Sequence, residues 1–145
     1  QHENVSFLRV ALAHGGDPNL ATGQFGETPI FNTIGVTGYE RREHRELLLR
    51  SGADINAKTR GMLFERPIGG KTPVMAAADL GRFDIVYELL TEGADFATTD
   101  VHGRNPADQV SRNIGAFVPG SPYEVDLERA AEWLSQRGVM IREHR

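Results

Sequence analysis

The sequence predicts an all-α protein built from repeated pairs of short helices. Within residues 70–99, two short apolar patterns with helical spacing follow each other, and each is bounded by glycine. Gly93 after the second pattern suits the left-handed residue that ends a helix. Similar phrases recur along the chain, and Pro73 and Pro106 stand 33 positions apart in them. Because neither helix of such a pair buries its apolar face alone, the pair needs copies on either side.

The first helix of this central pair is expected to begin at Pro73, where the missing N–H costs nothing. The hydroxyl of Thr72 is expected to cap it. Val74, Ala77 and Ala78 form a small-residue face that lets neighbouring helices approach closely. The second helix carries a continuous apolar stripe, formed by Ile85, Val86, Leu89 and Leu90.

Two kinds of phrase recur in register. Phrases of the Gly-x-Thr-Pro kind open at residues 26, 70 and 103, and phrases of the Gly-x-Asp kind begin at residues 15, 52 and 93. Together they resemble the ankyrin repeat, whose period is about 33 residues. The resemblance implies an ankyrin-repeat solenoid with hairpin or loop fingers, a partial first unit and a modified cap as the last unit. A single domain, 1–145, would then hold about four helix-pair units, at approximately 1–25, 26–69, 70–102 and 103–145.

In chain order, residues 4–14 fit the second helix of the partial first unit. Its expected inward face consists of Val5, Leu8, Ala11 and Leu12. Residues 28–34 and 39–50 are expected to be the inner and outer helices of the second unit, joined by a lengthened turn at 35–38. On the outer helix, a run of arginines alternates with glutamates, which indicates a solvated face with paired charges, with a nucleic-acid patch as the alternative.

The second finger carries an insertion at residues 60–69 and is eight residues longer than its neighbour. Insertions in repeat proteins fall in loops on one face, often the binding face. Four large apolar residues, Met62, Leu63, Phe64 and Ile68, stand in this insertion. Two interpretations stay open: these side chains contact a partner, or they fold back onto the adjacent fingers.

The last unit departs from the repeat. Residues 105–112 are expected to form its inner helix, and residues 113–120 replace a tight turn. Ser121, followed by Pro122 and Glu124, predicts a full capping box for a final helix that runs to Arg137. Leu127, Ala130, Ala131 and Leu134 are its expected apolar stripe, and Trp133 beside it either seals the core or binds a partner.

Composition and motifs argue against several functions. The net charge of −4 with mixed signs gives no broad basic surface for nucleic acid, and no apolar run is long enough to span a membrane. No cysteine is present, and the five histidines lack metal-ligand spacing. Residues 69–72 look like the end of a phosphate-binding loop, but Glu65 stands where the first glycine is needed. We therefore expect no catalytic residues, no metal and no cofactor, and we expect that the protein is not an enzyme.

The resemblance implies a scaffold that binds a protein partner through its fingers and inner helices. Where the family has a histidine after Thr-Pro, this chain has Phe31, Met75 and Asp108, so the family's histidine hydrogen bonds are absent. Residue by residue, the expected partner-binding positions are Phe25, Glu27, Asn32, Lys58, Arg60, Met62, Leu63, Phe64, Arg66, Met75, Asp79, Asp100, His102 and Arg104.

The phrases at residues 13–20 and 26–31 and the ending at 133–139 are similar to bacterial ankyrin-repeat proteins. Several of those proteins are exported, often lipid-anchored, and act as immunity proteins against secreted effectors such as phospholipases. The resemblance therefore implies an inhibitor that binds and neutralises a toxin; a generic intracellular adaptor is the alternative. We expect a monomer when unbound, periplasmic if an export segment has been removed from before Gln1, and otherwise cytoplasmic.

Overall fold

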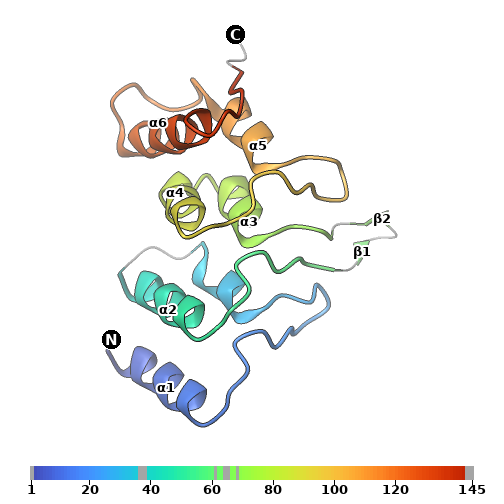
Figure 1. Cartoon of the computed structure of the whole chain (residues 1–145), viewed down its shortest axis with the longest axis vertical. Coiled ribbons are helices and arrows are strands. Elements are labelled where there is room, and N and C mark those ends of the chain that lie inside the picture. Colours follow the sequence, from blue (N-terminus) through green and yellow to red (C-terminus); the bar gives the residue numbers. More distant parts are fainter. Residues whose placement is uncertain (1, 36–38, 61, 64–65, 68, 143–145) are drawn as a thin grey trace.

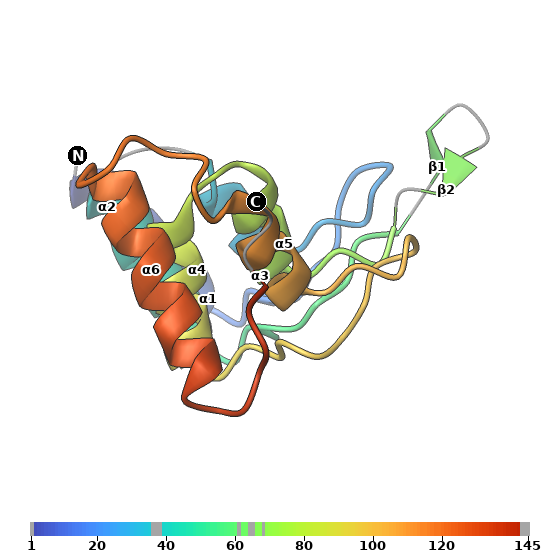
Figure 2. The same cartoon turned by 90° about the horizontal axis from the view of Figure 1, so that it is seen from above.

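The computed structural model describes residues 2–35, 39–60, 62–63, 66–67 and 69–142, and it describes no side chains for residues 2–4, 39–40, 62–63 and 66–67. Its helices form a stack of two columns, with finger-like loops that extend to one side (Figures 1 and 2). The outer column holds α1 (His2–Ala13), α2 (Tyr39–Arg50), α4 (Phe83–Thr91) and α6 (Pro122–Ser135). The inner column holds η1 (Pro29–Thr33), α3 (Pro73–Asp79) and α5 (Pro106–Asn113). The described part of the chain is thus helical, as expected, apart from the two-residue strands β1 (Met62–Leu63) and β2 (Arg66–Pro67).

The pair α3 and α4 forms the centre of the core. The small-residue face of α3 and the apolar stripe of α4 are buried, as predicted. The core continues from Ile30 of η1 to Leu134 of α6 without interruption. It therefore runs the length of the stack instead of closing on itself, which is typical of repeat proteins.

The outer column is not packed evenly. The backbones of α4 and α6 lie close together, and Ala130 of α6 is fully buried. No α-carbon of α2 comes within 8 Å of an α-carbon of α4. Arg45 of α2 stands between these two helices and is buried, with only 4% of its surface exposed. A large side chain holds apart one pair of outer helices, whereas small side chains let the other pair approach.

The buried Arg45 corrects the interpretation of the arginine run as a solvated face. Arg42 does pair with Glu46 along the helix, as expected. Arg45 instead turns inward, because it lies three residues before the buried Leu48 on the same face of α2. Spacing relative to Leu48 was the signal that could have identified it.

The starts of α6 and α5 differ from prediction. At α6, Ser121 accepts a hydrogen bond from the backbone N–H of Glu124, but the Glu124 carboxylate accepts from Gly120 and not from Ser121. The full capping box forms at α5, where Asn105 and Asp108 each accept a hydrogen bond from the backbone N–H of the other.

Three further expectations were wrong in detail. The inner helix at 28–34 is a 3₁₀ helix, η1, because Ile34 is already extended and Gly35 follows with a positive φ of 91°. The final helix ends at Ser135 and not at Arg137. Ala11 of α1 is exposed, although Val5 on the same helix is buried.

Candidate protein-binding surface

The fingers leave the helical stack at joints built by asparagine. The side chain of Asn19 accepts a hydrogen bond from the backbone N–H of Asp54 (2.6 Å) and donates one to the carbonyl of Gly52 (3.0 Å). Asn56 accepts in the same way from the backbone N–H of Asp95 (2.8 Å). Each joint therefore ties one closing phrase to the next. Ala97 stands where a third asparagine would be, and the series ends there.

The aspartates of the Gly-x-Asp phrases accept hydrogen bonds from nearby backbone N–H groups. Asp54 accepts a hydrogen bond from the backbone N–H of Asn56, and Asp95 accepts one from Ala97, both at 2.8–2.9 Å. These are turns in which a short polar side chain replaces a backbone acceptor. Asp108 is likewise occupied in the α5 capping box. The three carboxylates are thus engaged with backbone N–H groups.

The base of the long second finger is hydrogen-bonded to both of its neighbours. Thr59 bonds with Lys71 and Gly70 across the finger, at 2.9 and 2.7 Å. The backbone N–H of Arg60 donates to the carbonyl of Phe25 in the first finger (2.7 Å), and Val101 of the third finger donates to Gly69 (3.4 Å). The three fingers are joined at their bases into one surface.

The two glycines of the sequence that looks like a phosphate-binding loop have a structural role at this base. Gly70 has a φ of 80°, and a Cβ there would lie 3.2 Å from the backbone nitrogen of Val101. A Cβ on Gly69 would lie 3.0 Å from the carbonyl oxygen of Thr59. The Lys71 ammonium forms an ion pair with Asp79. Gly-Gly-Lys-Thr therefore permits close packing of fingers and begins α3.

Beyond this base, β1 and β2 form an antiparallel hairpin in which Met62 faces Pro67 and Leu63 faces Arg66. Figure 2 shows β1 and β2 projecting further from the helices than the neighbouring fingers. Of the expected contact residues, Phe64 lies outside the described residues, and the side chains of Met62, Leu63 and Arg66 also do. The two interpretations of the inserted apolar residues are thus not tested by the structure.

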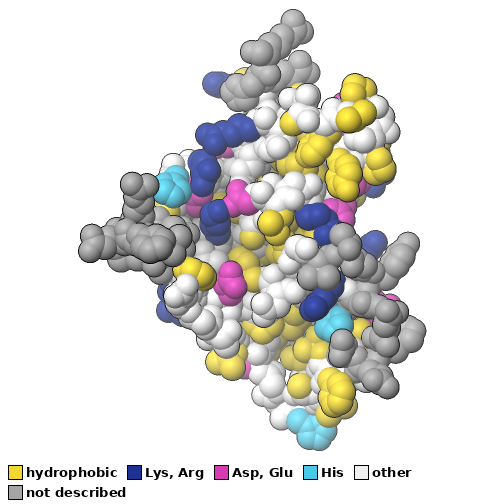
Figure 3. Space-filling view, turned by 180° about the vertical axis from the view of Figure 1, so that it is seen from behind, with side chains coloured by type: hydrophobic (Ala, Val, Ile, Leu, Met, Phe, Trp, Pro, Cys, Tyr) yellow, Lys and Arg dark blue, Asp and Glu magenta, His cyan; other side chains and the backbone are white. Residues whose placement is uncertain are grey.

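The structure places the other expected contact residues in three groups. Asn32, Lys58, Arg60 and His102 are exposed, and Phe25 and Glu27 are partly exposed on the first finger. Asp79 is exposed but engaged, because it pairs with Lys71 and accepts a hydrogen bond from Gln109 of α5 (2.6 Å). On the face shown in Figure 3, Lys and Arg side chains lie on the finger side and also on the side of the outer helices.

Met75 and Asp100 are corrections to the expected surface. Met75 is only 1% exposed, because it fills the core position that the family gives to histidine. Asp100 is 7% exposed and holds the third finger together: its carboxylate accepts from the backbone N–H groups of His102 (2.8 Å) and Arg104 (3.0 Å). The Arg104 guanidinium pairs with the same carboxylate (3.2 Å). We leave Met75 and Asp100 out of the surface.

The surroundings of Asp100 favour the ionised form of its carboxyl group. Burial alone would raise the pKa of its carboxyl, but the backbone N–H groups of Arg104 and His102, together with the Arg104 guanidinium, outweigh burial and lower that pKa. The third finger therefore keeps a charged, fully bonded centre.

Two threonine hydroxyls are left without hydrogen bonds in the core, where the ankyrin repeat would place a histidine nearby. The hydroxyls of Thr28 and Thr72 are buried and have no hydrogen-bond partner among the described residues. In particular, Thr72 does not cap α3, contrary to expectation. Phe31 and Met75, three positions after these threonines, offer no polar atom that could bond a hydroxyl.

We expect Thr72→Val to leave the free energy of unfolding unchanged or to raise it by about 1 kcal/mol, because valine removes a buried hydroxyl that has no partner. Urea denaturation measures the change. Thr33→Val is the matched control: this buried hydroxyl donates to the carbonyl of Ile30 (2.7 Å), so its removal should lower stability by about 1 kcal/mol. Equal losses for both variants would contradict the assignment.

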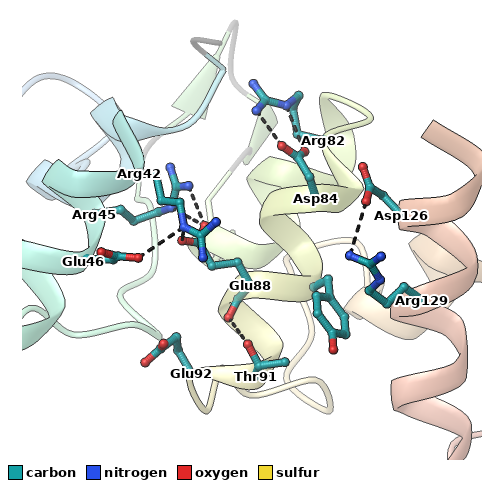
Figure 4. A pocket seen from close by; sticks show the side chains of 11 residues that line it. Arg42, Arg45, Glu46, Arg82, Asp84, Glu88, Thr91, Glu92, Asp126 and Arg129 are labelled. Carbon is teal, nitrogen blue, oxygen red and sulfur yellow. Dashed lines mark hydrogen bonds and ion pairs between the residues drawn. The ribbon is translucent and has the colours of Figure 1, made fainter. Parts of the chain in front are cut away.

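A groove lies on the outer side of the stack, opposite the fingers. It is an open groove of about 450 Å³ that runs from α2 across α4 to α6 (Figure 4). Glu88 of α4 accepts from Arg45 (2.5 and 2.8 Å) and also pairs with Arg42 (3.3 Å). Arg82 pairs with Asp84 at 2.8 Å. The charges lining this groove are therefore largely matched within the protein.

The acids of this groove differ in their proton affinity. Burial would raise the pKa of Asp84, but the hydrogen bond and charge of Arg82 lower it below its ordinary value. At Asp126, burial and then the charge of Asp84 raise the pKa, and Arg129 and Arg82 only partly oppose this. The groove is lined by an ion-pair network: Arg42 and Arg45 of α2 pair with Glu88 of α4, and the other pairs close within α2, at the start of α4 and within α6.

Among the described residues, no group of His, Asp and Glu side chains is placed to hold a metal ion. The described helices also include none with the length and apolar character needed to cross a membrane. Trp133 packs edge-on against Phe96, with ring centroids 5.8 Å apart, and thus covers the end of the core.

Comparison with known proteins gave one family match. The family described as ankyrin repeat matches residues 69–101, which contain the finger base, α3 and α4. The match supports an ankyrin-repeat protein. Ankyrin repeats form a family of protein-binding modules that are generally not enzymes. Comparison with curated proteins gave no match.

Proposed function

We propose that this chain binds a protein partner through its joined fingers and the exposed parts of its inner helices, and that the long second finger is the main contact element. The observation that carries this proposal is the β1–β2 hairpin, which extends past its neighbours from a base bonded on both sides. A rigid base limits the entropy that a loop loses when it binds. Insertions on one face of a repeat protein often mark the binding face.

We further propose four repeat units, the first partial and the last a modified cap. The repeated joints at Asn19 and Asn56 support this division, because each links equivalent phrases of successive units. The polar outer face of α6, with Glu128 and Glu132 exposed, suits the end of an array.

As the specific function we propose a bacterial immunity protein that neutralises a secreted toxin, such as a phospholipase. The sequence resemblance noted above supports it, and so does the shape of the second finger. A projecting hairpin with apolar residues fits a cleft better than a flat surface. The finger would occlude the active site of the toxin or hold its lid, and the binding protein itself would supply no chemistry. It would act as a monomer, in the periplasm if exported.

Changing Met62, Leu63 and Phe64 together to serine is expected to abolish neutralisation of the toxin while the protein stays folded. Three apolar anchors at a finger tip would supply most of the binding free energy, as clustered contacts do in other interfaces. The effector is captured with the parent protein as bait from a lysate of the source organism. Its hydrolase activity is then measured with and without each variant, and circular dichroism confirms folding.

The matched control removes two exposed apolar side chains outside the fingers, in Val118→Ser with Met140→Ser. This variant should neutralise as well as the parent. A folded triple variant that still protects would remove the finger from the mechanism.

The alternative is a generic adaptor for an intracellular protein. The exposed Asn32 on η1 would then matter more than the finger tip. Recovery of several cytoplasmic proteins that bind the triple variant as well as the parent would favour this alternative.

A further inference from the structure

We propose that the base of the long finger recognises an acidic patch on the protein partner, with the Arg60 guanidinium as the anchoring cation. This inference rests on the function proposed above and adds the chemistry of the partner surface.

Arg60 is held in place by the first finger. Its backbone N–H donates to the carbonyl of Phe25, and its side chain crosses Gly26. A Cβ built on Gly26 would lie 3.1 Å from the Arg60 Nε and 3.6 Å from its Nη2. Gly26 also has a positive φ of 59°. Glycine at this position leaves room for the Arg60 side chain to approach the neighbouring finger closely.

The guanidinium is nevertheless available. Arg60 is exposed, and it forms no ion pair with any side chain in the described ranges. Lys58, two residues earlier on the same finger, is also exposed and without such a pair among described side chains. An arginine that is already oriented loses less rotamer freedom when it binds a carboxylate in two-point fashion.

The charge of the second finger is opposite to that of the whole chain. Residues 53–72 contain Lys58, Arg60, Arg66 and Lys71 against Asp54 and Glu65, whereas the chain carries −4. Lys71 is neutralised by Asp79, and Asp54 is engaged in its turn. The cations that face outward from the base are therefore Lys58 and Arg60, and opposite charge on the partner would speed association and fix its orientation.

A protein fits this surface better than a nucleic acid. A nucleic-acid site needs a broad basic stripe that follows several phosphates. Here only two exposed cations among the described residues, Lys58 and Arg60, stand at the finger base, and Arg60 lies against Phe25 and Gly26 of the first finger. A local cluster of partner carboxylates matches a patch of this size.

The test is an NMR titration of the ¹⁵N-labelled chain with a deca-glutamate peptide at low salt. We expect the amide signals of Gly26, Lys58 and Arg60 to shift and the shifts to disappear as salt screens the charges. Arg60→Met should weaken peptide binding about fivefold or more, and Arg60→Lys should weaken it less because it keeps the charge. Arg112→Met, which removes an exposed arginine of α5, is the matched control and should bind like the parent.

Unchanged peptide affinity in a folded Arg60→Met variant would overturn the inference, and so would equal binding of a thymidine decanucleotide. The Met62, Leu63 and Phe64 triple serine variant separates the two proposals. If it loses the toxin but Arg60→Met keeps it, the finger function stands and the acidic-patch inference fails. If Arg60→Met loses both peptide and toxin, and the triple variant loses the toxin but still binds the peptide, both proposals hold.

Discussion

Replacing Glu88 with alanine is expected to lower the free energy of unfolding by about 3 to 5 kcal/mol, because it leaves the buried Arg45 without its counter-charge. The Arg45 guanidinium bridges α2 and α4 where their backbones do not touch, and its Nη1 also donates to the carbonyl of Thr33 (2.9 Å). Loss of the carboxylate therefore leaves the Arg45 cation unpaired between the two helices. Urea denaturation followed by circular dichroism measures the change.

Two further variants make this expectation specific. Glu92→Ala removes an exposed acid at the edge of the same groove and should change stability by less than about 0.5 kcal/mol. Arg45→Met combined with Glu88→Leu should recover much of the loss, because it removes both buried charges and keeps their volume. A double variant as unstable as Glu88→Ala would contradict this account of the joint.

Phe83→Ala is expected to cost about 3 to 5 kcal/mol, the range for a large aromatic side chain removed from a packed core. Phe83 is fully buried at the start of α4, and its ring meets Phe117 edge-on, with centroids 6.0 Å apart. Phe117 in turn stacks on Tyr123 at 5.9 Å. The three rings attach the 113–120 connection to the third helix pair. The Phe83→Ala variant should therefore also be less ordered in residues 113–120.

The measurement is again urea denaturation, together with amide hydrogen exchange of residues 113–120. Phe7→Ala is the matched control, since Phe7 is 75% exposed on α1 and should change stability by less than about 0.5 kcal/mol. Unchanged exchange rates in residues 113–120 of the Phe83 variant would show that the aromatic contacts do not order the connection.

Local signals in the sequence predicted the helices well. Pro73 begins α3 and Gly93 follows α4 as expected, because proline and glycine restrict the backbone by themselves. The turn aspartates Asp54 and Asp95 were also predictable, since their partners lie two residues away. Such features need no knowledge of distant contacts.

Features that depend on the neighbouring helix pair were not predictable in this way. The charge pattern around Arg45 suits a solvated helix. Its spacing from Leu48 places it on the inward face of α2, but its bridge to Glu88 depends on how α2 and α4 lie. Met75 and Asp100 stand at positions that suit contact with a partner, but the adjacent helices and the third-finger turn enclose them. The capping box at α5 was not predicted because Asn105 and Asp108 replace the Ser or Thr and the Glu or Gln that are typical of this motif.

The placement of the joints at Asn19 and Asn56 has an evolutionary consequence. Each asparagine bonds the closing phrase of the next helix pair, at the side of the finger that faces the helices. The joined residues are 35 positions apart in one case and 39 in the other. Closing a longer loop costs little, only about 0.6 kcal/mol per doubling of its length. Mutation is thus free to lengthen, shorten or replace a finger while the helical stack stays in register.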